Sequence, residues 1–357
     1  MECFILLQSV CLASHSGDRF GILISSTMSL KVLICIVFSL VMLHFTIVAT
    51  FRVHPTAVNN RPIIGVLTQE LNTFMEAAYQ NKYNSYIAAS YVKFLEGAGA
   101  RVVPIWIGKS ESYYENILSN INGVLLPGGD AYFNRSNGYA DAGDYIYKIA
   151  KRMNQNGEYF PILGVCLGFE LLTYLVARRT EHRKLCNSND QSVPLEFQPG
   201  YENSRLFKDA STDIIDILEN DNVTSNFHNY CTTEKALKAV HIYDQFRVLS
   251  LNSDLDGLRY ISSLEHVTFP FYGLQFHPEK NLYEWIIENI PHGNYPTKAA
   301  LYFAEFFVSE ARKSNHKFPS KKVEASSLIY NYPVTYTGLK NSSFVQCYLF
   351  KDKNNSN

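Results

Sequence analysis

The sequence carries little charge for its length. Of 357 residues, 32 are Lys or Arg and 33 are Asp or Glu, so 18% are charged and the formal net charge is −1. An average globular domain has about 25% charged residues. Because nucleic-acid binding depends on a basic excess that neutralises phosphates, we expect no nucleic-acid partner. The hydrophobic content of 46% excludes a disordered chain and predicts a globular protein.

Cysteine is scarce beyond the first 54 residues. The four that remain, Cys166, Cys186, Cys231 and Cys347, are too few for a disulfide scaffold in a chain of this length. Their spacings fit no zinc motif, so we expect no metal site. We expect each of them to be a small buried side chain or to take part in a single disulfide bond. Only Cys166 has sequence neighbours that indicate a role beyond a structural one.

Only one long hydrophobic run is present. It extends over residues 32–49 behind Lys31, a pattern typical of a signal peptide. A run of about 18 apolar residues also reaches the lower limit for a membrane span, so an uncleaved signal anchor is the alternative. We assign residues 1–54 to this segment, with translation beginning at Met1 or at Met28.

Four Asn-x-Ser/Thr sequons lie downstream of this run, at Asn134, Asn222, Asn341 and Asn354. Together with the signal they predict entry into the secretory pathway, N-glycosylation, and an extracellular, lysosomal or vacuolar location.

From residue 61 onward, short apolar runs alternate with helical segments. The runs cover residues 62–67, 101–107, 123–127 and 160–165, and the helical segments cover 84–98, 111–120, 141–155 and 167–177. This alternation predicts an α/β three-layer sandwich, with a mostly parallel central sheet and helices on both faces. In such sheets ligands bind at the carboxyl ends of the strands.

Residues 178–240 break the alternation. The segment is polar, with one helix expected at 212–218, and we interpret it as an insertion. Three apolar segments spaced like meandering strands follow, at 241–251, 258–265 and 271–276, and then a long amphipathic helix at 297–313. The sheet is expected to continue across the insertion, which gives one domain over residues 55–350 and a polar tail at 351–357.

The most specific local feature is Cys166, which ends an apolar run between Gly164 and Gly168. Flanking glycines permit a sharp turn from strand to helix that holds the central side chain exposed. The N–H groups and dipole at the start of the helix favour a thiolate, the form that attacks carbonyl groups. A buried structural cysteine is the alternative.

Two further strand ends complete a possible site. Residues 123–130 end in Pro127-Gly128-Gly129-Asp130, and the backbone N–H of Gly129 with that of Leu167 could form an oxyanion hole, although Pro-Gly-Gly is more often a simple turn. Residues 272–279 end in His277-Pro278-Glu279, where the histidine can transfer a proton and the carboxylate can orient its ring.

In this order, Leu-Pro-Gly-Gly (126–129), Gly-Val-Cys-Leu-Gly (164–168) and Gln-Phe-His-Pro-Glu (275–279) resemble the class I glutamine amidotransferase superfamily. More narrowly, the chain resembles the gamma-glutamyl hydrolase family, which hydrolyses folylpolyglutamates. The narrower resemblance covers residues 61–350 and includes the segments 61–66, 86–93, 99–104, 226–228, 304–313, 336–338 and 343–348.

The resemblance implies Cys166 as nucleophile, His277 as its proton-transfer partner and Glu279 as the group that orients His277. It also places His228, Glu170 and Tyr91 near the substrate. Without the resemblance, the sequence would favour a surface-loop position for His228, a helix-surface position for Glu170 and a core position for Tyr91. The implied activity is hydrolysis of γ-linked glutamate from folate or antifolate polyglutamates, without metal or organic cofactor, in a chain that can form homodimers.

Two other functions share parts of this pattern. A glutaminase module that feeds ammonia to a synthase would use the same triad, but the secretory signal and the absence of an attached synthase domain argue against it. A non-catalytic binding protein on this fold would be expected to have lost Cys166, His277 or Glu279, and all three are present.

Overall fold

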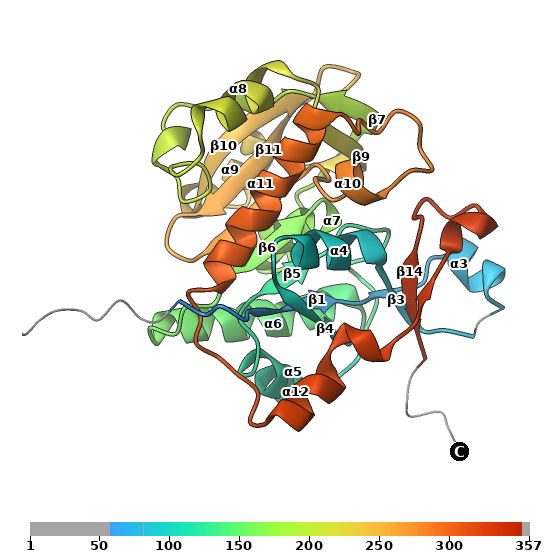
Figure 1. Ribbon diagram of the computed structural model, residues 1–357. Helices are drawn as coiled ribbons and strands as arrows, with labels where there is room; N and C mark the ends of the chain where they lie inside the picture. Colours follow the sequence, from blue (N-terminus) through green and yellow to red (C-terminus); the bar gives the residue numbers. More distant parts are fainter. Residues whose placement is uncertain (1–57, 81, 352–357) are drawn as a thin grey trace, which may run out of the picture. The chain divides into compact units, whose positions relative to one another are not determined.

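A computed structural model describes residues 58–80 and 82–351 (Figure 1). Within this part of the chain, eight strands form one sheet in the order β4-β1-β5-β6-β12-β11-β10-β8. These strands are β4 (Arg101–Ile105), β1 (Ile63–Leu67), β5 (Val124–Leu126), β6 (Ile162–Val165), β12 (Phe271–Leu274), β11 (Arg259–His266), β10 (Phe246–Ser253) and β8 (Glu196–Phe197).

The first five strands in this order are parallel and the last three pairings are antiparallel. Every residue of β1, β5, β6 and β12 is buried, as expected for parallel strands covered on both faces. The prediction of a mixed α/β fold around a large, largely parallel sheet is confirmed. The meander predicted after the insertion is the antiparallel part, β10-β11-β12.

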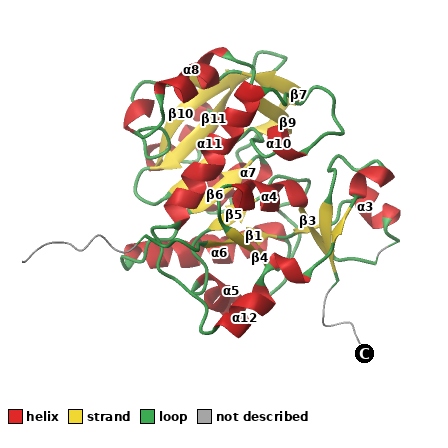
Figure 2. Cartoon of the chain, in the orientation of Figure 1, coloured by secondary structure: helices red, strands yellow, loops and turns green. Residues whose placement is uncertain are grey.

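Helices cover both faces of the sheet, so the fold has three layers (Figure 2). One hydrophobic cluster contains side chains of α4, α8 and α11, and the other contains side chains of α5, α6 and α7. The described helices are α3 (Thr73–Ala78), α4 (Ala89–Gly97), α5 (Glu111–Leu118), α6 (Tyr139–Gln155), α7 (Leu167–Val176), α8 (Thr212–Asn220), α9 (Glu234–Ala239), α10 (Lys280–Tyr283), α11 (Asn294–Ala311) and α12 (Lys321–Ser327), with short 3-10 turns at Tyr201–Asn203, Tyr243–Gln245, Ile329–Asn331 and Thr337–Lys340.

The helix predicted over residues 84–98 is only half correct. Its first part is strand β3 (Ser85–Ala88), and α4 begins afterwards. The cause is a partner from the far end of the chain: β3 pairs with β14 (Cys347–Phe350) in a second sheet, β13-β14-β3-β2. The remaining strands of that sheet are β13 (Val334–Thr335) and β2 (Gln69–Glu70).

The insertion contains more regular structure than its polar composition predicts. Its helix is α8, but two long strands, β7 (Lys184–Val193) and β9 (Thr224–Cys231), also pair as a separate two-stranded antiparallel sheet. A disulfide joins Cys186 on one strand to Cys231 on the other, while Cys166 and Cys347 are free and buried. Cross-strand pairing and this bridge stabilise strands that carry few apolar side chains.

The predicted amino-terminal segment and its boundary at residue 54 lie outside the described residues, as do residues 352–357 of the predicted tail. Among the helices that are described, none combines the length and apolar character needed to span a bilayer.

Glycines determine how closely α7 approaches the sheet. A Cβ atom added at Gly168 would lie 1.9 Å from the carbonyl oxygen of Leu126 on β5, and one added at Gly164 would lie 2.4 Å from the carbonyl oxygen of Gly168. Real Cβ atoms do not approach backbone this closely, so no other residue type fits at either position without a backbone shift. The turn between β6 and α7 therefore depends on both glycines.

Gly168→Ala is accordingly expected to destabilise the fold by about 1–3 kcal/mol, the usual cost of overpacking, because its methyl group would collide with backbone rather than with a flexible side chain. Chemical denaturation measures the change. Gly293→Ala is the matched control, since a Cβ there meets nothing closer than 3.8 Å. An unfolding midpoint for Gly168→Ala equal to that of Gly293→Ala would contradict the analysis.

Candidate active site

Cys166 sits between β6 and α7 in a strained backbone conformation. Its φ of 51° and ψ of −111° are rare for a residue with a side chain. The backbone holds it there: its N–H donates to the Leu274 carbonyl at 2.7 Å and its carbonyl accepts from the Glu170 N–H at 3.0 Å. The strand-to-helix turn predicted from the flanking glycines is present, but Cys166 is only 4% exposed, so the expectation of an exposed side chain is wrong.

His277 and Glu279 follow β12, the strand next to β6. Leu274 and Val165 are register partners, so Cys166 and His277 emerge at the same edge of the sheet. The Nδ1–H of His277 donates to Oε1 of Glu279 at 2.7 Å, and both side chains are buried. This bond assigns the ring hydrogen to Nδ1, so Nε2 is free to accept a proton.

Cys166 and His277 both lie next to Gly128. A Cβ atom added at this glycine would lie 2.7 Å from Cε1 of His277 and 3.0 Å from Cβ of Cys166. The two side chains therefore flank the same point at this edge of the sheet.

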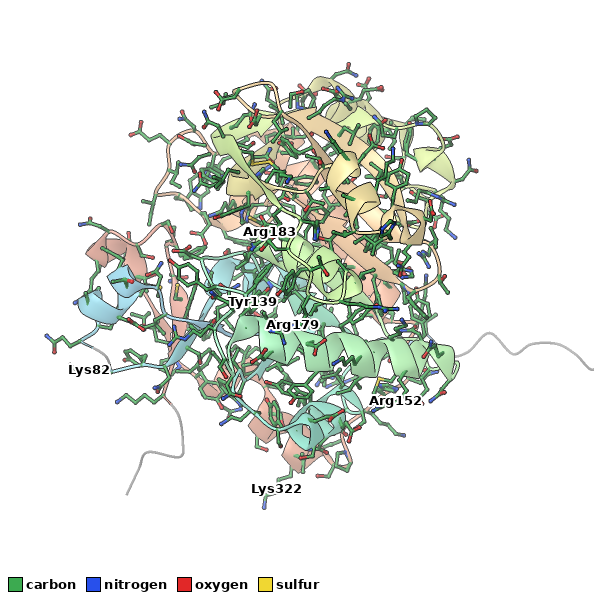
Figure 3. The ribbon with its side chains drawn as sticks, turned by 180° about the vertical axis from the view of Figure 1, so that it is seen from behind. Lys82, Tyr139, Arg152, Arg179, Arg183 and Lys322 are labelled. Atoms are coloured by element: carbon green, nitrogen blue, oxygen red, sulfur yellow. A yellow bond between two sulfur atoms is a disulfide. The ribbon has the colours of Figure 1, made fainter. Side chains whose placement is uncertain are left out.

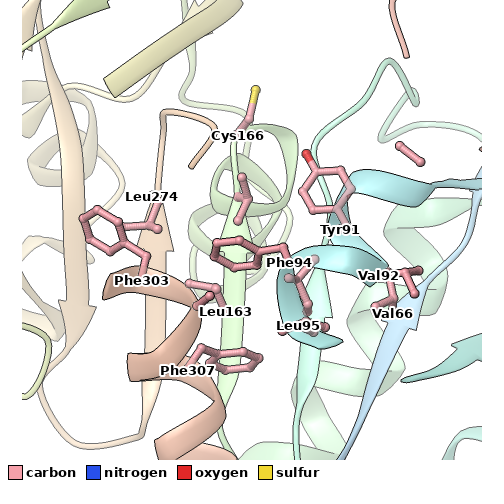
Figure 4. Close-up of a cluster of buried hydrophobic side chains, with 14 of the residues drawn as sticks. Val66, Tyr91, Val92, Phe94, Leu95, Leu163, Cys166, Leu274, Phe303 and Phe307 are labelled. Atoms are coloured by element: carbon pink, nitrogen blue, oxygen red, sulfur yellow. The ribbon is translucent and has the colours of Figure 1, made fainter. Parts of the chain in front are cut away.

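Tyr91, from α4, completes this cluster. Its hydroxyl accepts the Gly128 N–H at 2.8 Å and lies 3.2 Å from Nδ1 of His277. Figure 4 shows the hydroxyl of Tyr91 and the sulfur of Cys166 at the same end of the hydrophobic cluster beneath the site. Burial, with the charges of Glu279 and Cys166, raises the pKa of Tyr91, so the phenol stays protonated.

Two backbone N–H groups, those of Gly129 and Leu167, are the predicted donors of an oxyanion hole. The Leu167 N–H acts to lower the pKa of Cys166, and within the described residues the Gly129 N–H has no acceptor. The Gln69 amide donates to the carbonyls of Pro127 at 2.9 Å and Gly128 at 3.2 Å, which fixes the orientation of this loop. Gln69 has no motif around it, so the sequence did not indicate this role.

A cleft of about 420 Å³ opens beside the sulfur. Among the residues predicted to act in catalysis or substrate binding, the cleft is lined by Cys166, Leu167, Gly129, Glu170 and His228, whereas His277, Glu279 and Tyr91 do not line it. A larger cavity of about 590 Å³ lies elsewhere and contains none of these residues. The cleft with the sulfur is the candidate substrate site, because reaction requires contact with the nucleophile.

Comparison with known proteins gives the family. Residues 62–279 match the Peptidase C26 family. The chain belongs to this family. It is 43% identical to a gamma-glutamyl hydrolase of Bos taurus over 304 residues, which cover 83% of this chain and 92% of the relative. It is 38% identical to gamma-glutamyl hydrolase B of Dictyostelium discoideum, and the match covers 84% of this chain and 86% of the relative.

Among solved structures, a glutamine amido transferase from Methylobacillus flagellatus matches with a TM-score of 0.41 and 10% identity, covering 73% of this chain and 97% of that one.

In this C26 peptidase the resting cysteine is a thiol. Burial raises the pKa of Cys166 well above its ordinary value, and the charges of Glu170 and Glu279 raise it further. Burial also lowers the pKa of His277, although Glu279 opposes this shift. The expectation that the helix start favours a preformed thiolate is therefore wrong, because the loss of hydration outweighs the Leu167 N–H and the helix dipole.

Glu170 is a buried group and not a surface carboxylate. Its Oε2 pairs with Nη1 of Arg183 at 2.9 Å, and its Oε1 accepts from the Gln275 amide at 3.2 Å. Burial raises the pKa of Glu170 to about 7 despite these partners. Arg183 lies in the polar insertion, where no sequence pattern distinguished it from neighbouring arginines.

His228 lies on β9 and is buried, although the sequence alone allowed a surface loop. Its Nδ1 lies 3.0 Å from the Tyr230 carbonyl and its Nε2 3.2 Å from Oδ1 of Asn226. Burial, assisted by the charge of His277, lowers its pKa to about 3. The sulfurs of Cys186 and Cys231 are close to this ring, but they are joined to each other and offer no thiolate to a metal.

The described sequons are accessible. Asn134, Asn222 and Asn341 are all exposed, and Asn134 lies at the edge of the cleft. Asn354 lies outside the described residues.

His228 makes the folded protein sensitive to acid. Because its pKa falls from 6.5 to about 3 on folding, the unfolded chain binds a proton between these values that the folded chain does not bind. The group's contribution to stability is therefore complete above pH 6.5 and is lost as the pH falls, by about 1.4 kcal/mol per pH unit. We expect His228→Gln to flatten the fall in unfolding free energy between pH 6.5 and 4, measured by urea denaturation.

The control for this measurement is His241→Asn, which replaces an exposed histidine and should keep the wild-type slope. Equal slopes for His228→Gln and wild type would contradict the assignment.

Proposed function

We propose that this protein hydrolyses γ-glutamyl bonds of folylpoly-γ-glutamates, with Cys166 as nucleophile. One observation carries the proposal: Cys166, His277 and Glu279 meet at one sheet edge, beside an open cleft, in a chain of the Peptidase C26 family. Relatives that are gamma-glutamyl hydrolases by name cover nearly the whole folded part of the chain.

The first half of the reaction forms an acyl-enzyme. As the sulfur of Cys166 attacks the γ-carbonyl carbon, its proton passes to Nε2 of His277, and Glu279 stabilises the imidazolium that results. The carbonyl oxygen takes up negative charge and is stabilised by the N–H groups of Leu167 and Gly129. His277 then gives its proton to the leaving nitrogen, which breaks the amide bond and leaves a thioester.

The second half reverses the proton path. Water attacks the thioester carbon while His277 accepts its proton, and the proton returns to sulfur as the carboxylic acid product leaves. Because the resting thiol and imidazole are both neutral in this buried site, proton transfer accompanies each attack. The step uses no metal or organic cofactor.

A glutaminase module is the second candidate because it would use the same three residues. It is disfavoured by the match to gamma-glutamyl hydrolases along 86–92% of their own length. A non-catalytic binding protein is disfavoured by the intact hydrogen bond between His277 and Glu279 beside a free cysteine. Formation of a homodimer and the absence of a nucleic-acid partner remain predictions.

We also propose that the protein enters the secretory pathway and functions outside the cell, in lysosomes or in vacuoles. The run at residues 32–49 and the exposed sequons support this location. The mature chain is expected to begin after the apolar run and to carry N-glycans, as measured by mass spectrometry before and after enzymatic deglycosylation. An unglycosylated product that retains residues 32–49 would favour a signal anchor.

Removal of the nucleophile tests the chemistry. Cys166→Ala should lower kcat/KM by about 10³ or more with little change in folding, because covalent catalysis is lost while only one sulfur atom is removed. Cys347→Ala is the matched control: it removes the other free, buried cysteine, which lies on β14, and should retain turnover. Residual activity above a tenth of wild type in Cys166→Ala would refute the assignment.

Linkage tests the substrate. In a γ-linked chain the α-carboxylate remains free, whereas an α-linked peptide uses that carboxyl group in the scissile bond. A carboxylate-binding group left unpaired in a desolvated site costs about 1–3 kcal/mol, and misalignment of the carbonyl adds to this. We expect pteroyl-tri-γ-glutamate to be cleaved at least about 10² faster than its α-linked isomer; comparable rates would exclude a γ-glutamyl-specific site.

A further inference from the structure

Among the described residues that line the cleft beside Cys166 there is one arginine, Arg183, and no lysine. It precedes β7 and is 11% exposed, so its guanidinium group faces the cleft from a largely buried position. Arg179, four residues earlier, does not line the cleft and pairs with Asp141 instead. Figure 3 labels both arginines, with Arg183 above Arg179 in that view. A guanidinium group at a cleft can bind an anionic group of a substrate. The contacts of Arg183 show how this guanidinium group is held.

The guanidinium plane is held rigidly. Its carbon Cζ lies 4.0 Å from the ring centroid of Phe133 and 4.9 Å from that of Tyr230, so aromatic rings stack against it. In the plane, Nη1 donates to Glu170 at 2.9 Å, while Nε and Nη2 donate to the two carboxylate oxygens of Glu181 at 2.9 and 2.6 Å. A guanidinium held this way loses little further freedom when it binds a ligand.

Its hydrogen-bonding capacity is not used up. A guanidinium group has five N–H hydrogens, and these contacts use one on each nitrogen. One hydrogen on Nη1 and one on Nη2 therefore have no acceptor within the described part of the chain. Two N–H groups on one guanidinium are suited to bind the two oxygens of a carboxylate.

Glu181 is the partner most easily displaced. Its side chain is 55% exposed, whereas that of Glu170 is 4% exposed, so Glu181 can turn into solvent when another carboxylate arrives. Glu170 then keeps the guanidinium group in position from the side of the cysteine.

We propose that Arg183 binds the free α-carboxylate of the glutamyl residue whose γ-carbonyl Cys166 attacks. The inference rests on the proposed function and adds the group that selects γ-linked glutamate. The α-carboxylate is the one charged group that every γ-linked residue offers near its scissile bond. Binding it at Arg183 positions the γ-carbonyl between the sulfur of Cys166 and the N–H groups of Leu167 and Gly129.

The test compares two substrates that differ only at this carboxylate. One is pteroyl-di-γ-glutamate, and the other carries an α-carboxamide on the residue that contributes the scissile carbonyl. For the wild type we expect kcat/KM to be about 10- to 100-fold lower with the amide, since a charge-assisted pair is lost. Arg183→Gln should lose the same factor on the acid and show a ratio near one, while Arg183→Lys, with charge but no planar fork, should give an intermediate ratio.

Arg179→Gln is the matched control and should retain the wild-type ratio. An Arg183→Gln variant that still prefers the acid by the wild-type factor overturns the proposal, and so does a wild type that cleaves both substrates equally. A wild type that cleaves neither substrate would instead refute the proposed function.

Arg183→Gln leaves Glu170 buried without its cationic partner and can therefore fail to fold. A second pair of variants avoids this problem. Glu170→Gln removes the buried charge, and Glu170→Gln/Arg183→Gln adds only the loss of the guanidinium group. The acid-to-amide ratio should disappear in the double variant and persist in the single one; an unchanged ratio in the double variant overturns the proposal.

Discussion

The close approach of α7 to β5 is the constraint on which the site depends. Gly168 lies against the Leu126 carbonyl, and Gly164 lies against Gly168 itself, with no space for a Cβ atom at either position. This contact forces the chain to turn within one residue, which gives Cys166 its positive φ. The same turn presents the Leu167 N–H to the sulfur. The positions of the proposed nucleophile and of the proposed oxyanion donor are therefore consequences of a packing requirement in the core.

Burial of the proposed catalytic groups sets their protonation. Cys166, His277 and Glu279 are all nearly inaccessible, so the uncharged forms of the thiol and the imidazole are favoured at rest. The hydrogen bond to Glu279 does not reverse this effect, but it fixes the ring and stabilises positive charge once a proton arrives. A reaction in this site couples each bond-forming step to a proton transfer.

The substrate side of the cleft comes from the insertion rather than from the sheet alone. The two-stranded sheet β7-β9, whose strands are joined by Cys186–Cys231, holds His228 at the cleft, and Arg183 precedes its first strand. The parallel sheet thus carries the proposed nucleophile, while the β7-β9 sheet and the residue before it carry side chains that line the cleft. A rigid attachment between the two is needed because recognition and attack must act on the same molecule.

Much of this protein was predictable from short sequence patterns. Gly-Val-Cys-Leu-Gly and His-Pro-Glu each fall where an apolar run ends, and local rules place such ends at one edge of a parallel sheet. The alternation of strands and helices, the three layers and the meeting of Cys166 with His277 follow from these local signals.

Tertiary structure decided the remaining features, because these features depend on partners distant in sequence. Residues 85–88 became a strand only because β14 pairs with them, and the polar strands of the insertion formed only by pairing with each other. Burial shifted the pKa values of Glu170, His228 and Cys166. Arg183 is held at the cleft by contacts with Phe133, Glu170 and Tyr230 that no local sequence pattern encodes.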